Sequence, residues 1–386
     1  MKVMKAMRQM ILLTVCMVAV GLPQIDPEID ARLEKRSHTF QETTLPYRLY
    51  VPDNYSSDLS YPLLLFLHGA RWAGTDNVTQ LDNELALYWI DSTRQVSDPC
   101  FVVYPQIPRG STWEYTAGNV DELPESAELA TANDIITSLL AEFSIDASRL
   151  YLCGKSIGGL GVYGMVARYP DRYAALIPAA GSYLYRDFAT LSKHAMWIFH
   201  NRDDDVVSAE QSRHIVSALQ DMSAAVVLTH CDFSTGACNV LSNSEISSAI
   251  QSGARYFYSE FDDAGHQLEP NVVSTFGLYE WTMTQKRSLS KVESKISNPR
   301  FIGLLNNYPN PFNATTKIEF TISNASHVNL TIYGVQGQRV ATLLNSWLEK
   351  GRHVYTWQAE DVPSGVYVAK LTTDVTSHTK RCLLLK

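Results

Sequence analysis

The residues whose types and spacing are most suited to catalysis lie at 154–159, where the sequence reads Gly-Lys-Ser-Ile-Gly-Gly. They follow the apolar run 150–153 and precede a helix-like segment, which is the strand–turn–helix setting of a Gly-x-Ser-x-Gly nucleophile elbow. The residues flanking the serine must be tiny, and its hydroxyl then projects beside a helix N-terminus that favours negative charge. Ser156 is therefore predicted to be a nucleophile, with the N–H of Ile157 as an oxyanion donor. A glycine-rich structural turn is the alternative.

A nucleophilic serine needs a general base, and the base needs an acid that orients it. In a fold that carries such an elbow, the acid and then the histidine follow the serine along the chain. The acid is expected after the apolar run 195–199, where residue types alone leave three candidates: Asp203, Asp204 and Asp205. His266, in a loop after the strand candidate 254–258, is the predicted base.

A second oxyanion donor is expected in the loop that follows an early strand. The run 63–67 is followed by His-Gly-Ala, so the N–H of Ala70 is the predicted donor. We expect His68 to hold this loop through a hydrogen bond, because as a base it would stand in the wrong chain order.

Short apolar runs alternate with amphipathic stretches along the chain, and the strands and helices that they predict must position the catalytic groups. Strands are expected at 45–51, 62–67, 100–104, 149–153, 174–178, 195–199 and 254–258. Helices are expected at about 126–142, 157–169, 208–220 and 272–286. Strands that are apolar throughout and separated by helices indicate an α/β fold, a mostly parallel sheet with helices on both faces. Ligands of such sheets bind at the carboxyl ends of the strands, where the predicted site residues fall.

Taken together, these motifs resemble the secreted α/β-hydrolase esterases grouped with polyhydroxyalkanoate depolymerases, feruloyl and acetylxylan esterases and predicted peptidases. The resemblance covers about residues 40–287 and rests on the segments 47–52, 67–70, 74–77, 104–106, 154–159, 167–172, 200–207 and 265–266. It implies an α/β-hydrolase fold over a catalytic domain at 30–287. The family pattern His-Gly-x-x-Asp-x-x-Val, laid on 200–207, selects Asp204 as the acid and keeps Asp203 and Asp205 as fallbacks.

Two departures from the family pattern bear on the substrate. Relatives commonly have Gly-Glu-Arg where this chain has Arg71-Trp72-Ala73, which puts a cation and a large aromatic ring near the expected pocket mouth. Arg71 and Trp72 are therefore predicted to bind substrate, with surface packing as the alternative. Trp113, which follows the Pro-Gln element at 105–106, is predicted to line the same cleft, and His68 is counted with these substrate-binding residues. The insertion 230–252, rich in Ser and Asn, is expected to form a lid or rim.

From residue 288 the composition becomes that of a linker, expected at 288–300. Six short alternating runs follow, at 317–322, 328–333, 339–344, 352–358, 365–373 and 380–385, and predict a small antiparallel, Ig-like β-sandwich at 301–386. The segments 308–313, 332–340, 363–368 and 380–386 resemble the C-terminal sorting domain of the bacterial type IX secretion system. The resemblance implies passage to the cell surface, with release or surface attachment; a carbohydrate-binding sandwich is the alternative.

The N-terminus has the pattern of a signal peptide, expected at 1–22, because three basic residues precede an apolar run too short to span a bilayer. We therefore expect no stable transmembrane segment in the mature chain and a secreted or cell-surface location. Of the net charge of −8, residues 1–21 and 301–386 carry +3 each, which leaves −14 on 22–300 and disfavours nucleic acid as a partner. Cys231 and Cys238 are candidates for a local disulfide, whereas Cys100 and Cys153 are expected to be buried thiols.

The sequence thus predicts a secreted serine hydrolase that cleaves carboxylic esters, acting on acyl groups of polysaccharides or related polymers, with no cofactor and no metal. The expected partners are the ester substrate and, through the C-terminal domain, the type IX secretion machinery. Two alternatives stay open: a serine peptidase of the prolyl-oligopeptidase-like type, and a non-catalytic surface-binding protein on a hydrolase scaffold. Pocket shape decides the substrate, and the sequence does not reveal it.

Overall fold

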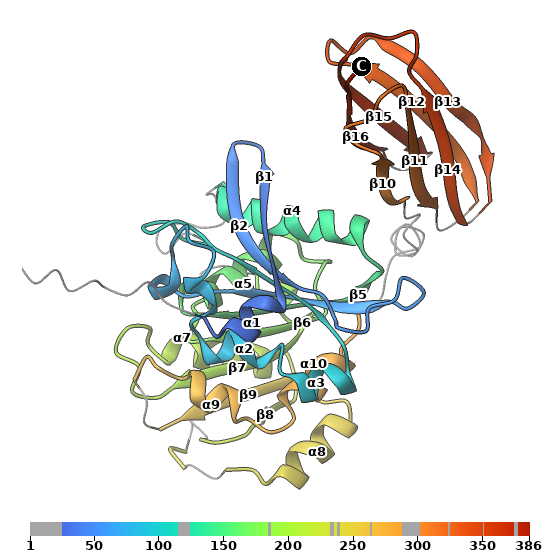
Figure 1. Ribbon diagram of the computed structural model, residues 1–386. Helices are drawn as coiled ribbons and strands as arrows, with labels where there is room; N and C mark the ends of the chain where they lie inside the picture. Colours follow the sequence, from blue (N-terminus) through green and yellow to red (C-terminus); the bar gives the residue numbers. More distant parts are fainter. Residues whose placement is uncertain are drawn as a thin grey trace, which may run out of the picture.

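The computed structural model describes residues 25–114, 124–183, 187–231, 235–237, 240–262, 265–287, 302–322, 325–349, 351–373 and 377–386 (Figure 1). The expected signal peptide and the linker 288–300 lie outside these residues, as does Cys238. Among the helices described, none is long and apolar enough to cross a membrane.

A nine-stranded sheet forms the centre of the N-terminal part of the described chain. Its spatial order is β1 (Leu33–Phe40), β2 (Thr43–Tyr50), β4 (Phe101–Pro105), β3 (Tyr61–Leu67), β5 (Ile145–Lys155), β6 (Ala175–Ala179), β7 (Ala195–Asn201), β9 (Tyr256–Phe261) and β8 (Val226–Leu228). The pairs β1–β2 and β2–β4 are antiparallel. The other six pairs are parallel. Their carboxyl ends therefore meet at one edge, which carries the predicted site.

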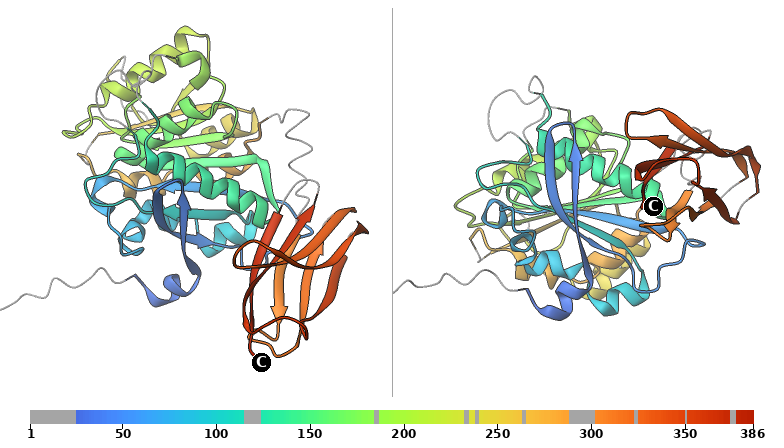
Figure 2. Two further views of the ribbon diagram at one scale, coloured as in Figure 1. Left: turned by 90° about the horizontal axis from the view of Figure 1, so that it is seen from above. Right: turned by 45° about the horizontal axis from the view of Figure 1, so that its top comes forward.

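Helices cover both faces of this sheet (Figure 2). The α-helices are α1 (Pro27–Ala31), α2 (Glu84–Tyr88), α3 (Ser92–Ser97), α4 (Ala127–Glu142), α5 (Ile157–Arg168), α6 (Phe188–Leu191), α7 (Glu210–Asp221), α8 (Asn243–Gln251), α9 (Glu269–Val273) and α10 (Leu278–Thr284). Two short 3-10 helices, η1 (Ala70–Trp72) and η2 (Thr79–Leu81), follow β3.

The central strand β3 shows how the two faces are buried. Its odd-numbered leucines, 63, 65 and 67, join a hydrophobic cluster with residues of α4, α5 and α7. Leu64 and Phe66 join a second cluster with residues of α2, α9 and α10. All seven residues of β3 are buried, which is the signature of a central parallel strand. The expected α/β architecture is confirmed.

The structure also contains elements that were not predicted, among them the short helices α1, α2, α3 and α6. Three further differences have a clear physical reason. The edge strand β1 was not predicted, because only one of its eight side chains is buried and it carries little apolar pattern. The strand β8 is only three residues long and gave too little signal. The single helix expected at 272–286 is two helices, α9 and α10, because Gly277 adopts φ +80° between them.

The insertion 230–252 contains one helix, α8, that was not predicted. It begins with a capping box in which Ser242 and Glu245 satisfy each other's backbone N–H groups. Its residues Ile246 and Ile250 pack against Gly277 at the start of α10. The helix of the insertion thus adds to the core. The lid or rim was expected from the insertion as a whole, and its residues 232–234 and 238–239 lie outside the described residues.

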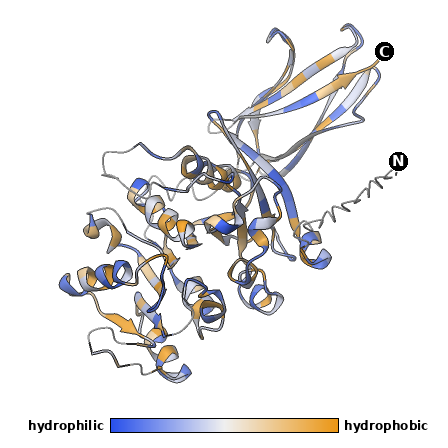
Figure 3. Cartoon of the chain, turned by 90° about the vertical axis from the view of Figure 1, so that its left-hand side faces the viewer, coloured by the Kyte–Doolittle hydropathy of each residue, from blue (hydrophilic) through white to orange (hydrophobic). Residues whose placement is uncertain are grey.

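The C-terminal residues form two antiparallel sheets. One contains β10 (Ile302–Tyr308), β11 (Thr315–Ile322) and β14 (Gly351–Gln358); the other contains β13 (Arg339–Leu348), β12 (Ser326–Gly334), β15 (Gly365–Thr373) and β16 (Ser377–Leu384). Their strands alternate between hydrophobic and hydrophilic residues (Figure 3), and Phe320 and Trp357 of one sheet share a core with Leu330 and Leu371 of the other. The expected sandwich is confirmed, with β10 as a strand that was not predicted.

Cysteine use fits the expectation in part. Cys100, Cys153 and Cys382 are buried free thiols. Cys231 is disulfide-bonded. Its expected partner, Cys238, lies outside the described residues.

Candidate active site

Ser156 lies in the turn between β5 and α5. Its backbone is strained, with φ 58° and ψ −120°. A Cβ atom at Gly154 would stand 2.3 Å from the Gly158 carbonyl oxygen, and one at Gly158 would stand 1.9 Å from that of Leu67. Both positions therefore admit only glycine, and the tight turn lifts the half-buried serine above the strand end. This is the local geometry of a nucleophile elbow.

The structure brings Ser156 together with His266 and Asp204. The Nε2 atom of His266 lies 3.0 Å from the Ser156 Oγ, and the Nδ1 atom lies 2.8 Å from Asp204 Oδ2 and 3.0 Å from Oδ1. An ionised carboxylate can only accept, so Nδ1 carries the hydrogen and donates it to Asp204. In the neutral imidazole, Nε2 is then left as an acceptor that faces the serine hydroxyl.

Asp204 is held in its charged form by its surroundings. Burial by itself would raise the pKa of Asp204, but hydrogen bonds from His200, from the backbone N–H groups of Val207 and Val206, and from His266 outweigh it and hold the pKa well below its usual range. The two backbone donors lie 2.8 and 2.9 Å from Oδ1. The carboxylate is thus a fixed, buried acceptor for the imidazole.

The three adjacent aspartates separate clearly in the structure. Asp204 is 9% exposed and contacts His266, whereas Asp203 and Asp205 are exposed. Asp203 Oδ1 accepts from the Gly265 N–H at 3.0 Å, and Asn201 Nδ2 donates to the Gly265 carbonyl at 2.8 Å. The loop that carries His266 is therefore tied to the loop that carries Asp204. The sequence does not reveal this supporting role of Asn201 and Asp203, although the run of aspartates is visible in it.

The loop after β3 lies directly against the elbow. Gly158 of the elbow lies so close to Leu67, at the end of β3, that it leaves no room for a Cβ atom. A Cβ atom at Gly69 would lie 3.3 Å from the Lys155 carbonyl oxygen. Ala70 is the first residue of η1 and Ile157 is the first residue of α5. The N–H groups of first helical residues have no partner within their helix, so both remain able to donate to a bound anion.

His68 holds this loop from inside. The Ile107 N–H donates to His68 Nε2 at 3.1 Å, so Nδ1 carries the ring hydrogen and donates to the Gly69 carbonyl at 2.8 Å. Burial lowers the pKa of His68 to about 4, which keeps the ring neutral. Trp113 Nε1 donates to the His68 carbonyl at 2.9 Å and both residues are fully buried.

The predicted substrate-binding residues therefore divide. His68 and Trp113 are fully buried and present no surface to a substrate, so for these two the expectation of substrate contact is wrong. They pack beneath the loop that follows β3 and support it. Trp72 is 5% exposed and its Nε1 donates to the Asp82 carbonyl, so its main role is also packing. Arg71 is exposed beside Ala70, with its guanidinium carbon 5.8 Å from the centroid of the Trp72 ring, and its contact with substrate stays a prediction.

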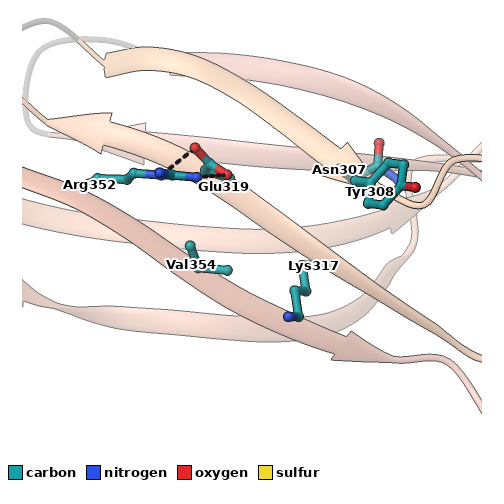
Figure 4. Close-up of a pocket in the computed structure, with 6 residues that line it drawn as sticks. All are labelled: Asn307, Tyr308, Lys317, Glu319, Arg352 and Val354. Atoms are coloured by element: carbon teal, nitrogen blue, oxygen red, sulfur yellow. Dashed lines mark hydrogen bonds and ion pairs between the residues drawn. The ribbon is translucent and has the colours of Figure 1, made fainter.

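A hollow of about 250 Å³ lies on the C-terminal sandwich (Figure 4). Its lining is Asn307, Tyr308, Lys317, Glu319, Arg352 and Val354. Glu319 and Arg352 form an exposed ion pair across it. The lining contains no serine, cysteine or histidine, so this hollow carries no nucleophile with its base.

A mainly parallel sheet, helices on both faces and a serine at a strand–helix elbow define the α/β-hydrolase class. The chain belongs to the esterase family described as "Putative esterase", whose model matches residues 37–269. Residues 306–384 match the "Secretion system C-terminal sorting domain" family, so the sandwich is a sorting domain of that kind.

Individual relatives are similar to parts of this chain. The bifunctional acetylxylan esterase/xylanase XynS20E of Neocallimastix patriciarum is 28% identical over 176 residues, which are 45% of this chain and 23% of that protein. A thermostable esterase of known crystal structure is 29% identical with a TM-score of 0.53, over 67% of this chain and 64% of that one. The feruloyl esterase module from Clostridium thermocellum is 14% identical with a TM-score of 0.46, over 67% and 91% of the two chains.

Proposed function

We propose that this protein is a serine esterase that hydrolyses carboxylic esters through Ser156, His266 and Asp204. One observation carries the proposal: the serine hydroxyl, at a strained elbow, lies 3.0 Å from an imidazole whose other nitrogen is 2.8 Å from a buried carboxylate. That chain of contacts activates a serine for nucleophilic attack. The membership of the esterase family supports the same reaction.

The reaction follows from the geometry. Ser156 Oγ attacks the ester carbonyl carbon while its proton passes to His266 Nε2, and the resulting imidazolium is stabilised by Asp204. The negative charge on the carbonyl oxygen is met by the N–H groups of Ala70 and Ile157. His266 then gives the proton to the leaving alcohol. Water next attacks the acyl-enzyme: His266 takes a proton from the water and returns it to Ser156 Oγ as the carboxylic acid leaves.

Acyl groups on polysaccharides are the proposed substrates. The curated relative bears the name acetylxylan esterase/xylanase, and the proposal carries the esterase half of that name to this chain. Because the match spans less than a quarter of that relative, the acyl group and the alcohol are left to experiment. The same three residues could in principle cleave an amide, so a peptide substrate belongs in the comparison.

Replacing Ser156 by alanine tests the proposal. We expect wild-type protein to hydrolyse p-nitrophenyl acetate and to release acetate from acetylated xylan, and we expect Ser156→Ala to lose both activities by about 10⁴-fold or more. Methyl ferulate and a chromogenic peptide, assayed alongside, rank the ester classes against amides. The folded state is checked by far-UV circular dichroism and thermal unfolding. A variant that stays folded and keeps its activity would contradict the assignment.

We also propose that the sorting domain directs the esterase domain through the type IX secretion machinery to the cell surface or the medium of a bacterial host. The match of residues 306–384 to the sorting family supports this route.

A further inference from the structure

A buried ion pair stands directly beside the proposed nucleophile. Lys155, the residue before Ser156, is 4% exposed, and its Nζ atom lies 3.0 Å from Oε1 of Glu269, which is 8% exposed. Glu269 is the first residue of α9 and follows His266 by three positions. The pair therefore joins the strand end that carries the serine to the loop that carries the histidine.

The same lysine contacts a third segment. Its Nζ lies 5.3 Å from the centroid of the Trp72 ring, within the range of a cation–π interaction. Trp72 ends η1, whose first residue is Ala70, and its ring lies 3.0 Å from the position of a Cβ at Gly69. Lys155 thus contacts the serine elbow through its backbone, the oxyanion loop through Trp72 and the histidine loop through Glu269.

We propose that Lys155 and Glu269 are positioning residues for the esterase reaction: their ion pair fixes the His266 loop against the Ser156 elbow, and Lys155 also supports the oxyanion loop. This rests on the proposed function. On its N-terminal side the His266 loop is already tied at Gly265 by Asn201 and Asp203. The pair supplies the second attachment, on the C-terminal side, so that His266 is held between two fixed points.

The cost of such a pair argues for a role beyond stability. Removing two charges from water is expensive, and well-packed apolar residues of similar volume are often as stabilising or more so. Here the compensation is incomplete, since Glu269 Oε2 is buried and accepts no hydrogen bond from the described residues. What an ion pair adds over an apolar contact is direction, because it holds one atom of each loop at a set distance.

The decisive variant replaces both partners, Lys155→Met with Glu269→Leu. Its apolar contact should keep the melting temperature at or above that of wild type, while the orienting contact is lost. We expect kcat for p-nitrophenyl acetate to fall at least tenfold with KM within twofold. We also expect backbone hydrogen exchange in peptides covering 265–273 to become at least tenfold faster.

The single variants complete a double-mutant cycle. Lys155→Met alone leaves a buried carboxylate without its partner, so its melting temperature should drop although its kcat should match that of the double variant. Arg149→Met is the matched control, since it breaks an ion pair with Asp146 at 2.7 Å, near the other end of β5. It should leave kcat and the exchange of 265–273 unchanged.

Two results would overturn the inference: a double variant that keeps kcat within twofold of wild type, or one whose exchange at 265–273 does not change. If the wild-type protein hydrolyses no ester at all, the proposed function fails. The exchange measurement then still decides on the attachment, because faster exchange in the double variant supports it and unchanged exchange refutes it.

Discussion

At the scale of residues, the site depends on the direction of each hydrogen bond. Asp204 has no hydrogen to give, so His266 must donate from Nδ1 and present Nε2 to Ser156. A second histidine, His200, also helps to position Asp204. Its Nε2 donates to the Val207 carbonyl at 2.8 Å and lies 3.5 Å from Asp204 Oδ2. Buried contacts therefore fix the Asp204 carboxylate independently of its contact with the His266 imidazole.

This arrangement predicts different effects for the three adjacent aspartates. Asp204→Asn can donate from its amide, which favours the wrong tautomer of His266, so kcat should fall by about 10⁴-fold. Asp203→Asn weakens the tie to Gly265 and should cost about tenfold or less, because the Asn201 bond to the same residue remains. Asp205→Asn, at an exposed neighbour, serves as the control and should stay within twofold. Steady-state kinetics on p-nitrophenyl acetate measure all three, and a larger loss for Asp205 than for Asp204 would reverse the assignment of the acid.

At the scale of elements, the ends of strands and the first residues of helices do the positioning. β5 ends at Lys155 and α5 begins at Ile157, so one turn supplies both the proposed nucleophile and a proposed backbone donor. β3 ends at Leu67 and η1 begins at Ala70, which brings a second N–H without a partner in its own helix to the same edge of the sheet. His68, Trp113 and Ile107 hold that loop from the interior, so the proposed donor is held in place before any substrate binds.

Proline at position 70 tests the second donor. Ala70→Pro deletes the N–H, and the site accepts proline because a first helical position tolerates it and Gly69, with ψ 169°, is extended as a residue before proline must be. We expect kcat to fall by about 10²- to 10³-fold, the usual cost of one oxyanion donor. Ala70→Ser keeps the N–H and should remain within about threefold. Equal activity in the two variants, measured with the same ester and with melting temperatures recorded, would remove Ala70 from the oxyanion site.

At the scale of the whole molecule, the chain divides its tasks between parts with separate cores. The two clusters of the esterase domain draw on residues between 33 and 283, and the sandwich cluster draws on residues between 312 and 384. Ser156, Asp204 and His266 all fall inside the segment matched by the esterase family. The acidic charge also belongs to the middle of the chain, whereas the C-terminal segment is basic.

Deletion of the sorting domain should therefore separate delivery from catalysis. A chain that ends at residue 300, expressed in a host with type IX secretion, should stay inside the cell envelope, while its kcat/KM for p-nitrophenyl acetate should lie within twofold of the full chain. Fractionation and enzyme assay of each fraction measure both. The reciprocal fusion of 301–386 to a periplasmic reporter should bring the reporter to the surface. Surface delivery of the shortened chain, or failure of the fusion, would contradict the proposed role of the domain.

Much of this protein could be predicted from short segments of its sequence. The elbow at 154–159 was visible because a tight strand–turn–helix connection imposes small residues locally, and the parallel sheet was visible because strands buried on both faces must be apolar throughout. Elements that lack those constraints were missed: β1 has only one buried side chain, β8 is very short, and the break at Gly277 leaves no gap in the apolar pattern.

Only the tertiary structure decided how distant segments meet. The residue types left three aspartates open and the family pattern selected Asp204, but it is the packing of the β7 and β9 loops that places this carboxylate 2.8 Å from His266. Nothing local distinguishes a Trp113 that lines a cleft from one that is buried behind His68. The ion pair of Lys155 and Glu269 likewise arises from the contact of two strand-end loops, because side-chain distances across a sheet edge are set by the whole fold and not by neighbours in sequence.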